Sequence, residues 1–234
     1  MSAETRIDLT TPRYQTFEII EEFVAYSADP ASVGDGWRTF DAVGTGSYAI
    51  VAASGSAWGV VSITTGAASG DGRHLGLGTV SANGAIDDLG TIAPWEAWFR
   101  FSISATTSVI SLVGFLSNPF GIETTCDQIT LRFDTASDTT FKVLCRASGT
   151  STVTDTTVTP VASTYYSLRI WSDVAGTIKF RMYSAVGAPV GVEVSISTNV
   201  PGTVMTPDFF IGTRTTAART MSADTFRMFG TLAR

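Results

Sequence analysis

The chain has 234 residues, of which 44% are hydrophobic and 11% aromatic, whereas only 15% carry charge. Its length fits one large all-β domain with a sizeable core, and its net charge of −6, with only two lysines, argues against a nucleic-acid partner. No apolar run approaches the roughly 18 residues of a membrane span, and the first residues lack the layout of a secretion signal, so no membrane partner is expected.

Residues 1–13 are polar and end in a Thr-Thr-Pro break, which predicts a short N-terminal arm followed by a single domain over residues 14–234. The segment 14–24 opens that domain. Its glutamates are compatible with a helix, but its β-branched and aromatic residues favour a strand.

Beyond residue 30 the chain alternates short strand-forming runs with turn-forming residues, and no long helix is indicated. Thr, Ser, Gly, Ala and Val replace much of the missing charge, so the polar strand faces are rich in hydroxyl groups. The predicted strands cover residues 37–40, 48–53, 59–64, 74–80, 95–103, 109–116, 128–133, 140–146, 165–171, 177–183, 190–197, 209–213 and 220–229.

Alternation within these runs identifies the two faces of each strand. Phe99 and Phe101 share one face of their strand, and Trp98 occupies the other. Trp171 likewise lies opposite Leu168. Period-two patterning with a turn about every 8 to 15 residues predicts a two-sheet antiparallel β-sandwich with jelly-roll connections.

Two cysteines raise the question of a disulfide. A hairpin with arms at residues 129–133 and 141–145 places Cys145 opposite Ile129, three positions from Cys126. That offset does not satisfy the spacing that a disulfide requires, so we favour two buried free thiols. A bulge in the hairpin leaves the bridged alternative open.

The residue types that catalysis needs are sparse. His74 is the only histidine, and alternation places it opposite Leu75, at the surface or rim of the sandwich. Neither a Ser-His-Asp triad nor a zinc site has supporting spacing, and no cofactor motif is present. No catalytic residue, cofactor or metal ligand is therefore assigned.

Carboxylates could still serve a glycosidase or a calcium site. Glycoside hydrolysis needs two carboxylates facing one sugar, about 5–10 Å apart. Glu96 and Glu193 stand alone on separate predicted strands, so each is interpreted as a polar-face residue, with their pairing in the folded chain left open. Calcium would need clustered oxygen atoms; Asp71 and the Asp87-Asp88 pair are candidates, with turn capping as the preferred interpretation.

The tryptophans indicate a contact surface. Five are numerous for this length, and core packing does not require all of them. A loop at residues 118–122 also carries an apolar tip. The candidate ligand or interface contacts are Trp98, Trp171, Trp37 and Phe120.

Six segments together resemble the concanavalin A-like sandwiches of the laminin-G and pentraxin type that are common among structural proteins of tailed bacteriophages. They are WEAWFRF (95–101), SLVGFL (111–116), ITLRFD (129–134), TYYSLRI (164–170), TIKFRMY (177–183) and TNVP (198–201), within a resemblance that covers about residues 35–230. The resemblance implies a protein that decorates the phage head or forms part of a tail or fibre, in some cases contacting host glycans. The metal ligands of the lectins and the carboxylate pair of the glycanases are not found here, which favours the structural branch.

Two classes of function follow. The first is a non-enzymatic virion surface protein, assembled in the host cytoplasm, that decorates the phage head or otherwise belongs to the tail. Its partners would be the major capsid protein, other virion proteins and further copies of itself. The second is a tail or fibre adhesion module that binds host glycans through exposed tryptophans. A glycoside hydrolase using Glu96 and Glu193 is the least favoured, and the chain is expected not to be an enzyme.

Overall fold

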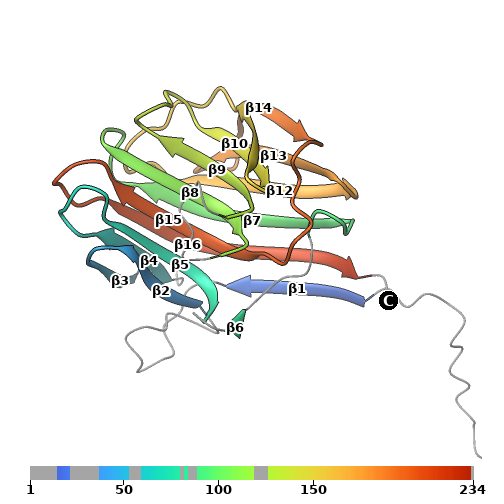
Figure 1. The fold of residues 1–234 in the computed structure, drawn as a ribbon, viewed down its shortest axis with the longest axis horizontal. Coiled ribbons are helices and arrows are strands. Elements are labelled where there is room, and N and C mark those ends of the chain that lie inside the picture. Colours follow the sequence, from blue (N-terminus) through green and yellow to red (C-terminus); the bar gives the residue numbers. More distant parts are fainter. Residues whose placement is uncertain are drawn as a thin grey trace, which may run out of the picture.

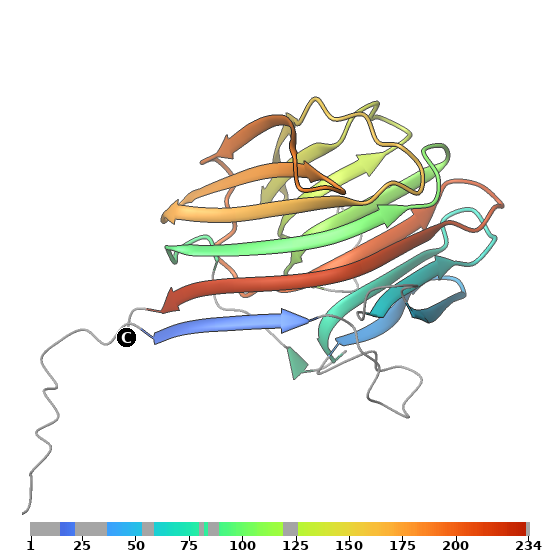
Figure 2. The ribbon, with the colours of Figure 1, turned by 180° about the vertical axis from the view of Figure 1, so that it is seen from behind.

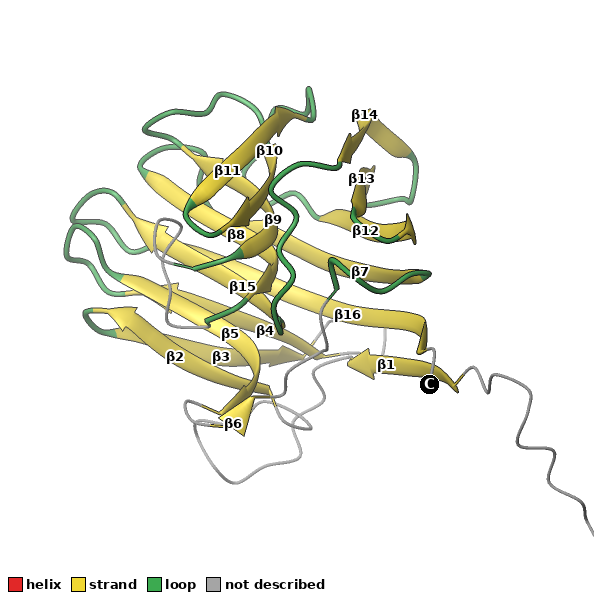
Figure 3. Cartoon of the chain, turned by 45° about the vertical axis from the view of Figure 1, so that its right-hand side comes forward, coloured by secondary structure: helices red, strands yellow, loops and turns green. Residues whose placement is uncertain are grey.

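The computed structural model describes residues 15–21, 37–52, 59–79, 82–83, 89–118 and 126–232. Within these ranges every helix or strand assigned is a β-strand, which confirms the all-β prediction (Figure 3). In chain order the strands are β1 (Gln15–Glu21), β2 (Trp37–Val43), β3 (Gly46–Ala52), β4 (Gly59–Thr65), β5 (Gly72–Thr79), β6 (Ala82–Asn83), β7 (Trp95–Ile103), β8 (Val109–Leu116), β9 (Gln128–Asp134), β10 (Lys142–Ala147), β11 (Thr150–Asp155), β12 (Tyr166–Val174), β13 (Thr177–Ser184), β14 (Pro189–Ile196), β15 (Thr206–Thr213) and β16 (Thr220–Leu232).

The strands form two antiparallel sheets that face each other (Figure 1). Sheet A has the order β14-β13-β12-β7-β16-β4-β3, and β1 also pairs with β16. Sheet B has the order β11-β10-β9-β8-β15-β5-β2, and β6 pairs with β5. The chain passes between the sheets after β1, β2, β4, β6, β7, β11, β14 and β15, so the predicted two-sheet sandwich is confirmed.

The long strand β16 explains how the N-terminal part joins the sheet. One edge of β16 pairs with β7. The other edge is divided, because residues 220–223 pair with β4 and residues 226–232 pair with β1. Figure 2 shows β1 continuing the sheet beside β16. The strand predicted within residues 14–24 is therefore confirmed over 15–21, whereas the N-terminal arm at residues 1–13 lies outside the described residues.

Two strands, β6 and β11, were not predicted. β11 has the sequence TSTVTD, and its side chains alternate only between exposed and half-buried. It therefore lacks the apolar face by which a strand is recognised in a sequence. It forms because a two-residue turn, Ser148-Gly149, folds it back on β10. Both residues have positive φ, 49° and 84°, as a type I′ hairpin turn requires.

The hairpin of β9 and β10 has the predicted register, with Cys145 opposite Ile129. Cys126 lies just before β9, and both cysteines are buried and free. Burial raises the pKa of the Cys126 thiol to about 11 and that of Cys145 to about 12. Both groups are therefore neutral thiols at ordinary pH.

Aromatic rings from both sheets meet in the core. Phe99 on β7 points inward and is fully buried, whereas its neighbour Trp98 points outward. The Phe99 ring centroid lies 4.9 Å from Phe226, 5.3 Å from Phe115 and 5.5 Å from Phe209. These contacts are tilted or edge-to-face, the arrangements that aromatic pairs prefer. The core therefore fixes the orientation of β7 and with it the side chains on the outer surface of sheet A.

Candidate functional site

The outer side of sheet A gathers charged and aromatic side chains in register. Pairing between β13, β12, β7 and β16 places them in three rows across the sheet. Neighbours within a row lie about 5 Å apart, so the rows form one continuous surface, which we call the Arg–Trp face. Its rows are Lys179, Trp171, Glu96 and Phe229; Arg181, Arg169, Trp98 and Arg227; and Tyr183, Ser167, Arg100 and Thr225.

Arg169 lies at the centre of this face, between two tryptophans. Its guanidinium carbon is 4.2 Å from the ring centroid of Trp171 and 5.8 Å from that of Trp98. The ring of Tyr183 lies 5.1 Å from that of Trp98, at an interplanar angle of 39°. Three strands thus supply one cluster of stacked side chains, in which Arg169 adds cation–π attraction.

Glu96 holds this cluster in place. Its Oε2 accepts a hydrogen bond of 2.5 Å from Arg169, and its Oε1 accepts one from the Trp98 indole. Burial opposes the charge of Arg169, but the hydrogen bond and the charge of Glu96 raise the pKa of that guanidinium overall. Arg169 is therefore a fixed cation beside Trp98.

Two further ion pairs lie at the edges of the Arg–Trp face. Lys179 donates to Asp173 at 2.7 Å, and this hydrogen bond lowers the pKa of Asp173. The Trp171 indole donates to the same carboxylate at 3.3 Å. Arg100 pairs with Asp224 at 2.7 Å. These contacts restrict the long basic side chains and so reduce the entropy that ligand binding would cost.

A hollow of about 360 Å³ opens on this face. Its size falls at the lower end of the range for small-molecule sites. Aromatic rings, two guanidinium groups and two hydroxyls surround it, so it offers flat apolar surface together with hydrogen-bond donors. The lining residues are Trp98, Phe99, Arg100, Ser167, Thr225, Arg227 and Phe229.

The four candidate contact residues have different positions. Trp98 and Trp171 lie together on the Arg–Trp face, although Trp171 is only 6% exposed beneath Arg169 and Lys179. Trp37 is fully buried in the core, 5.4 Å from the ring of Phe226. The proposal of Trp37 as a ligand contact is therefore wrong, because its position on β2 faces the other sheet.

Phe120, the fourth candidate, lies outside the described residues, as does the Asp87-Asp88 pair.

Most of the basic residues of the Arg–Trp face were not identified from the sequence. Arg181 and Tyr183 could have been found from the alternation of TIKFRMY, in which Lys179, Arg181 and Tyr183 share one side. A single sequence does not indicate that β12 pairs with both β13 and β7, which is what brings these side chains close to Trp98.

The two glutamates considered for glycoside hydrolysis are not brought together. Glu96 lies on β7 and Glu193 on β14, with β12 and β13 between them. Three strand spacings of about 4.8 Å separate the two residues by about 14 Å. This exceeds the separation of a carboxylate pair that acts on one sugar. Glu96 is moreover engaged by Arg169 and Trp98.

Asp71, the other calcium candidate, caps a turn. Its Oδ2 accepts a hydrogen bond of 3.0 Å from the Ala68 amide. A Cβ atom placed on Gly44 would come within 1.7 Å of Asp71 Oδ1, so the loop fits closely around the carboxylate. Among the described residues, no group of three His, Cys, Asp or Glu side chains is placed to hold a metal ion.

His74 departs from its prediction. It was expected at the surface or rim, but it is fully buried on the outer side of sheet B, where Nδ1 lies 2.8 Å from Oδ1 of Asp208. Its ring lies 4.5 Å from that of Phe210. Burial raises the pKa of Asp208, and the charge of His74 opposes this. The prediction failed because sheet B is also buried on its outer side, as Leu112 and Leu144 show.

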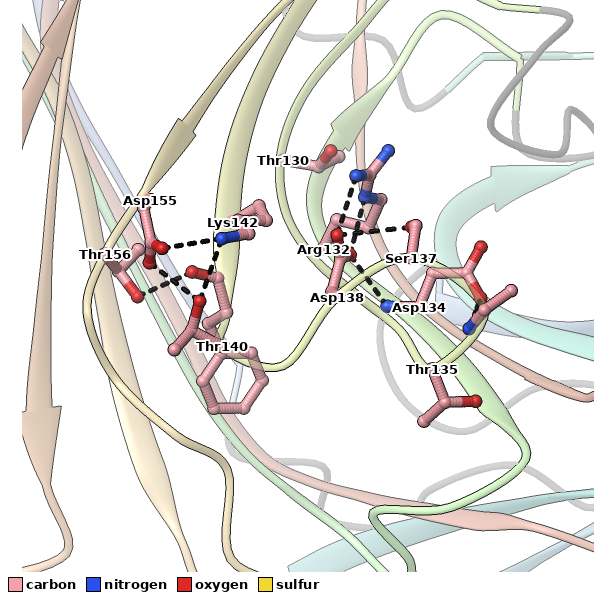
Figure 4. A network of polar contacts seen from close by, with 12 residues as sticks. Thr130, Arg132, Asp134, Thr135, Ser137, Asp138, Thr140, Lys142, Asp155 and Thr156 are labelled. Atoms are coloured by element: carbon pink, nitrogen blue, oxygen red, sulfur yellow. Dashed lines mark hydrogen bonds and ion pairs between the residues drawn. The ribbon is translucent and has the colours of Figure 1, made fainter.

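A second polar cluster lies at the turn between β9 and β10 (Figure 4). Arg132 donates to both carboxylate oxygens of Asp138, at 2.9 and 3.0 Å, and Asp138 also accepts from the Asp134 amide. Nearby, Lys142 donates to Asp155 at 2.6 Å. These acids are satisfied by neighbours within the same hairpins. The cluster therefore stabilises turns and strand pairing.

The sequence matches no protein-family model and no curated protein. Solved structures do match. A protein of unknown function from Shewanella oneidensis MR-1 superposes with a TM-score of 0.69 at 16% identity, over 95% of this chain and 90% of that one. The CBM2 module of the evolved Dit of Lactobacillus casei BL23 phage J-1 gives 0.61 at 11%, over 95% and 99%. Bacillus licheniformis β-glucanase gives 0.56 at 12%, over 90% and 97%.

The fold is concanavalin A-like. Lectins and glucanases share this two-sheet arrangement, in agreement with the resemblance seen in the sequence. At these identities the similarity establishes the fold alone. The described part of the chain also contains no helix of the length and apolarity that a membrane span requires.

Proposed function

We propose that this chain is a non-catalytic carbohydrate-binding module of a tailed-phage structural protein, and that it binds glycans on the Arg–Trp face. The observation that carries the proposal is the joining of Trp98, Tyr183 and Arg169 in one cluster beside a hollow. Trp98 lies on β7, far in the sequence from Arg169 on β12 and Tyr183 on β13, yet the three side chains lie on one continuous surface.

The chemistry of this face suits a sugar. The apolar side of a sugar ring packs on flat aromatic rings such as Trp98 and Tyr183, while its hydroxyls need donors and acceptors at the rim. Arg100, Ser167 and Thr225 supply those groups. Because Glu96 fixes Arg169 and the Trp98 indole, the platform is organised before a ligand arrives.

The absence of catalysis is part of the proposal. Glu96 is separated from Glu193 by two strands and is occupied by Arg169 and Trp98, so it is poorly suited to proton transfer. A glycanase reaction would need an acid that is poised toward the substrate.

The phage context is supported by the similarity to the CBM2 module of a phage Dit protein, which is a carbohydrate-binding module by its name. Two locations at the virion surface compete. Head decoration was the first hypothesis from the sequence, and tail or fibre adhesion was the alternative. The Arg–Trp face favours adhesion, since a decoration role does not call for a preorganised aromatic and basic surface. Other virion proteins and further copies of the chain are the proposed partners.

Binding to a panel of neutral and acidic polysaccharides, followed by tryptophan fluorescence, tests the proposal. Saturable binding to at least one glycan is expected, with at least a tenfold loss in Trp98→Ala. Val153→Ala, an exposed position on sheet B, is the control and should bind unchanged. No binding across the panel, or full binding by Trp98→Ala, would refute the proposal.

The number of copies per purified particle, counted by mass spectrometry, tests the location. A few copies per particle support adhesion. Hundreds in a simple ratio to the shell protein would overturn adhesion in favour of head decoration, and none would refute the virion assignment.

A further inference from the structure

The Arg–Trp face is basic although the chain as a whole is acidic. Strands β13, β12, β7 and β16 carry five basic side chains, all on this face, against three acidic ones. The whole chain has a net charge of −6. The positive charges are thus concentrated where the aromatic platform lies. The basic residues are Lys179, Arg181, Arg169, Arg100 and Arg227.

The central row of the face brings like charges together. Arg169 on β12 is directly opposite Arg181 on β13, and Trp98 separates Arg169 from Arg227 on β16. Like charges directly opposite each other destabilise a sheet. Glu96 pairs with Arg169, whereas Arg181 has no ion-pair partner among the described residues. An anion lying along the row would relieve the repulsion.

The row also has the dimensions of an extended ligand. From β13 to β16 it crosses three strand spacings of about 4.8 Å, or about 14 Å in total, which exceeds one sugar ring. Guanidinium groups bind planar carboxylates through two parallel hydrogen bonds, a geometry that a hydroxyl cannot reproduce. Arginine rather than lysine occupies every basic position of the two rows that flank the hollow.

We infer that the ligand of the Arg–Trp face is an acidic polysaccharide, in which uronic-acid carboxylates pair with Arg181 and Arg169 while the sugar rings pack on Trp98 and Tyr183. This inference rests on the proposed function and adds the chemical class of the glycan. It makes the affinity dependent on salt, because charge attraction at an open surface is screened.

The experiment compares two forms of one polymer. Polygalacturonate and its carboxyl-reduced, neutral form have the same backbone and differ only in charge. Titration calorimetry with the full chain should give at least tenfold tighter binding to polygalacturonate, and this preference should shrink as salt rises. Arg181→Gln should weaken polygalacturonate binding about fivefold, as expected for one partly screened charged contact, and leave binding to the reduced polymer unchanged.

Arg146→Gln is the matched control, because this arginine lies on sheet B and should not affect either polymer. Equal binding of the two polymers, or an equal loss in both arginine variants, would overturn the acidic-glycan inference while leaving the proposed function standing. Binding to neither polymer would also overturn the inference. If no glycan in the wider panel bound either, the proposed function itself would fail.

Discussion

Glu96→Gln separates a structural role for Glu96 from a catalytic one. Glutamine keeps the shape of the side chain but has one carbonyl oxygen in place of two acceptor oxygens. Glu96 now accepts from both Arg169 and the Trp98 indole. In the variant one of these donors must face the amide NH₂ group, and Arg169 loses its neutralising charge.

The expected cost follows from the exposure of the pair. The side chains of Arg169 and Glu96 are 29% and 30% exposed, so the pair lies between a surface and a buried ion pair. Exposed pairs contribute about 0.2–1 kcal/mol, and hydrogen bonds to charged groups about 1.5–3 kcal/mol. We expect Glu96→Gln to lower the free energy of unfolding by about 1 kcal/mol. For a domain of this size that lowers Tm by about 2–4 °C.

Thermal unfolding at low and high salt measures this effect, with Glu193→Gln as the control. Glu193 is exposed on β14, so its substitution should change the free energy of unfolding by less than about 0.5 kcal/mol. The loss in Glu96→Gln should shrink at high salt.

Two outcomes would refute this reasoning. An unchanged Tm at low salt would mean that Glu96 does not hold Arg169 and Trp98. Sugar release by the unmodified protein that Glu96→Gln abolishes would mean that Glu96 is a catalytic acid.

Three further predictions concern the scaffold. Because burial raises the pKa of Cys126 to about 11 and of Cys145 to about 12, neither thiol should react with a thiol reagent at pH 8 until denaturant is added; rapid labelling of the native protein would contradict this. Hydrogen bonds, chiefly from Lys142, lower the pKa of Asp155 from 3.8 to about 2. The stability from this carboxylate is therefore present above its ordinary pKa and lost as pH falls through about 2. NMR titration should show this midpoint, and Lys142→Met should move it toward 3.8; equal midpoints in the two proteins would be inconsistent with this pairing. Phe99→Ala should cost about 3–5 kcal/mol in denaturant unfolding, because the ring touches three others in the core, and a cost below about 1 kcal/mol would disprove that packing.

Alternation allowed the sequence to show which residues share a face, because the side-chain period of a strand is two. Phe99 and Trp98 were assigned to opposite sides of β7, and the structure confirms this. The hairpin register at Cys145 was also predictable, since the turn that sets it lies close in the sequence. Local information of this kind establishes the class of fold.

Pairing between distant strands could not be predicted in this way. Glu96 and Arg169 are 73 positions apart, and nothing in either segment indicates that β7 pairs with β12. The assignment of Trp37 failed for a related reason. By alternation, the nearest residues on its side of β2 are Thr39 and Asp41, so only the position of β2 opposite sheet A shows that the ring belongs to the core.

The two sheets differ in a way that decides where a ligand can bind. On sheet B, β8 reads VISLVGFL and carries apolar residues on both sides, a pattern that indicates burial on both faces. The burial of His74 and Phe210 on its outer side follows from this. On sheet A, β7 and β13 are apolar on one side only, and their other side carries arginines and aromatic rings. The inner strands of sheet A therefore present long basic side chains beside partly exposed aromatic rings, which is why we place recognition there.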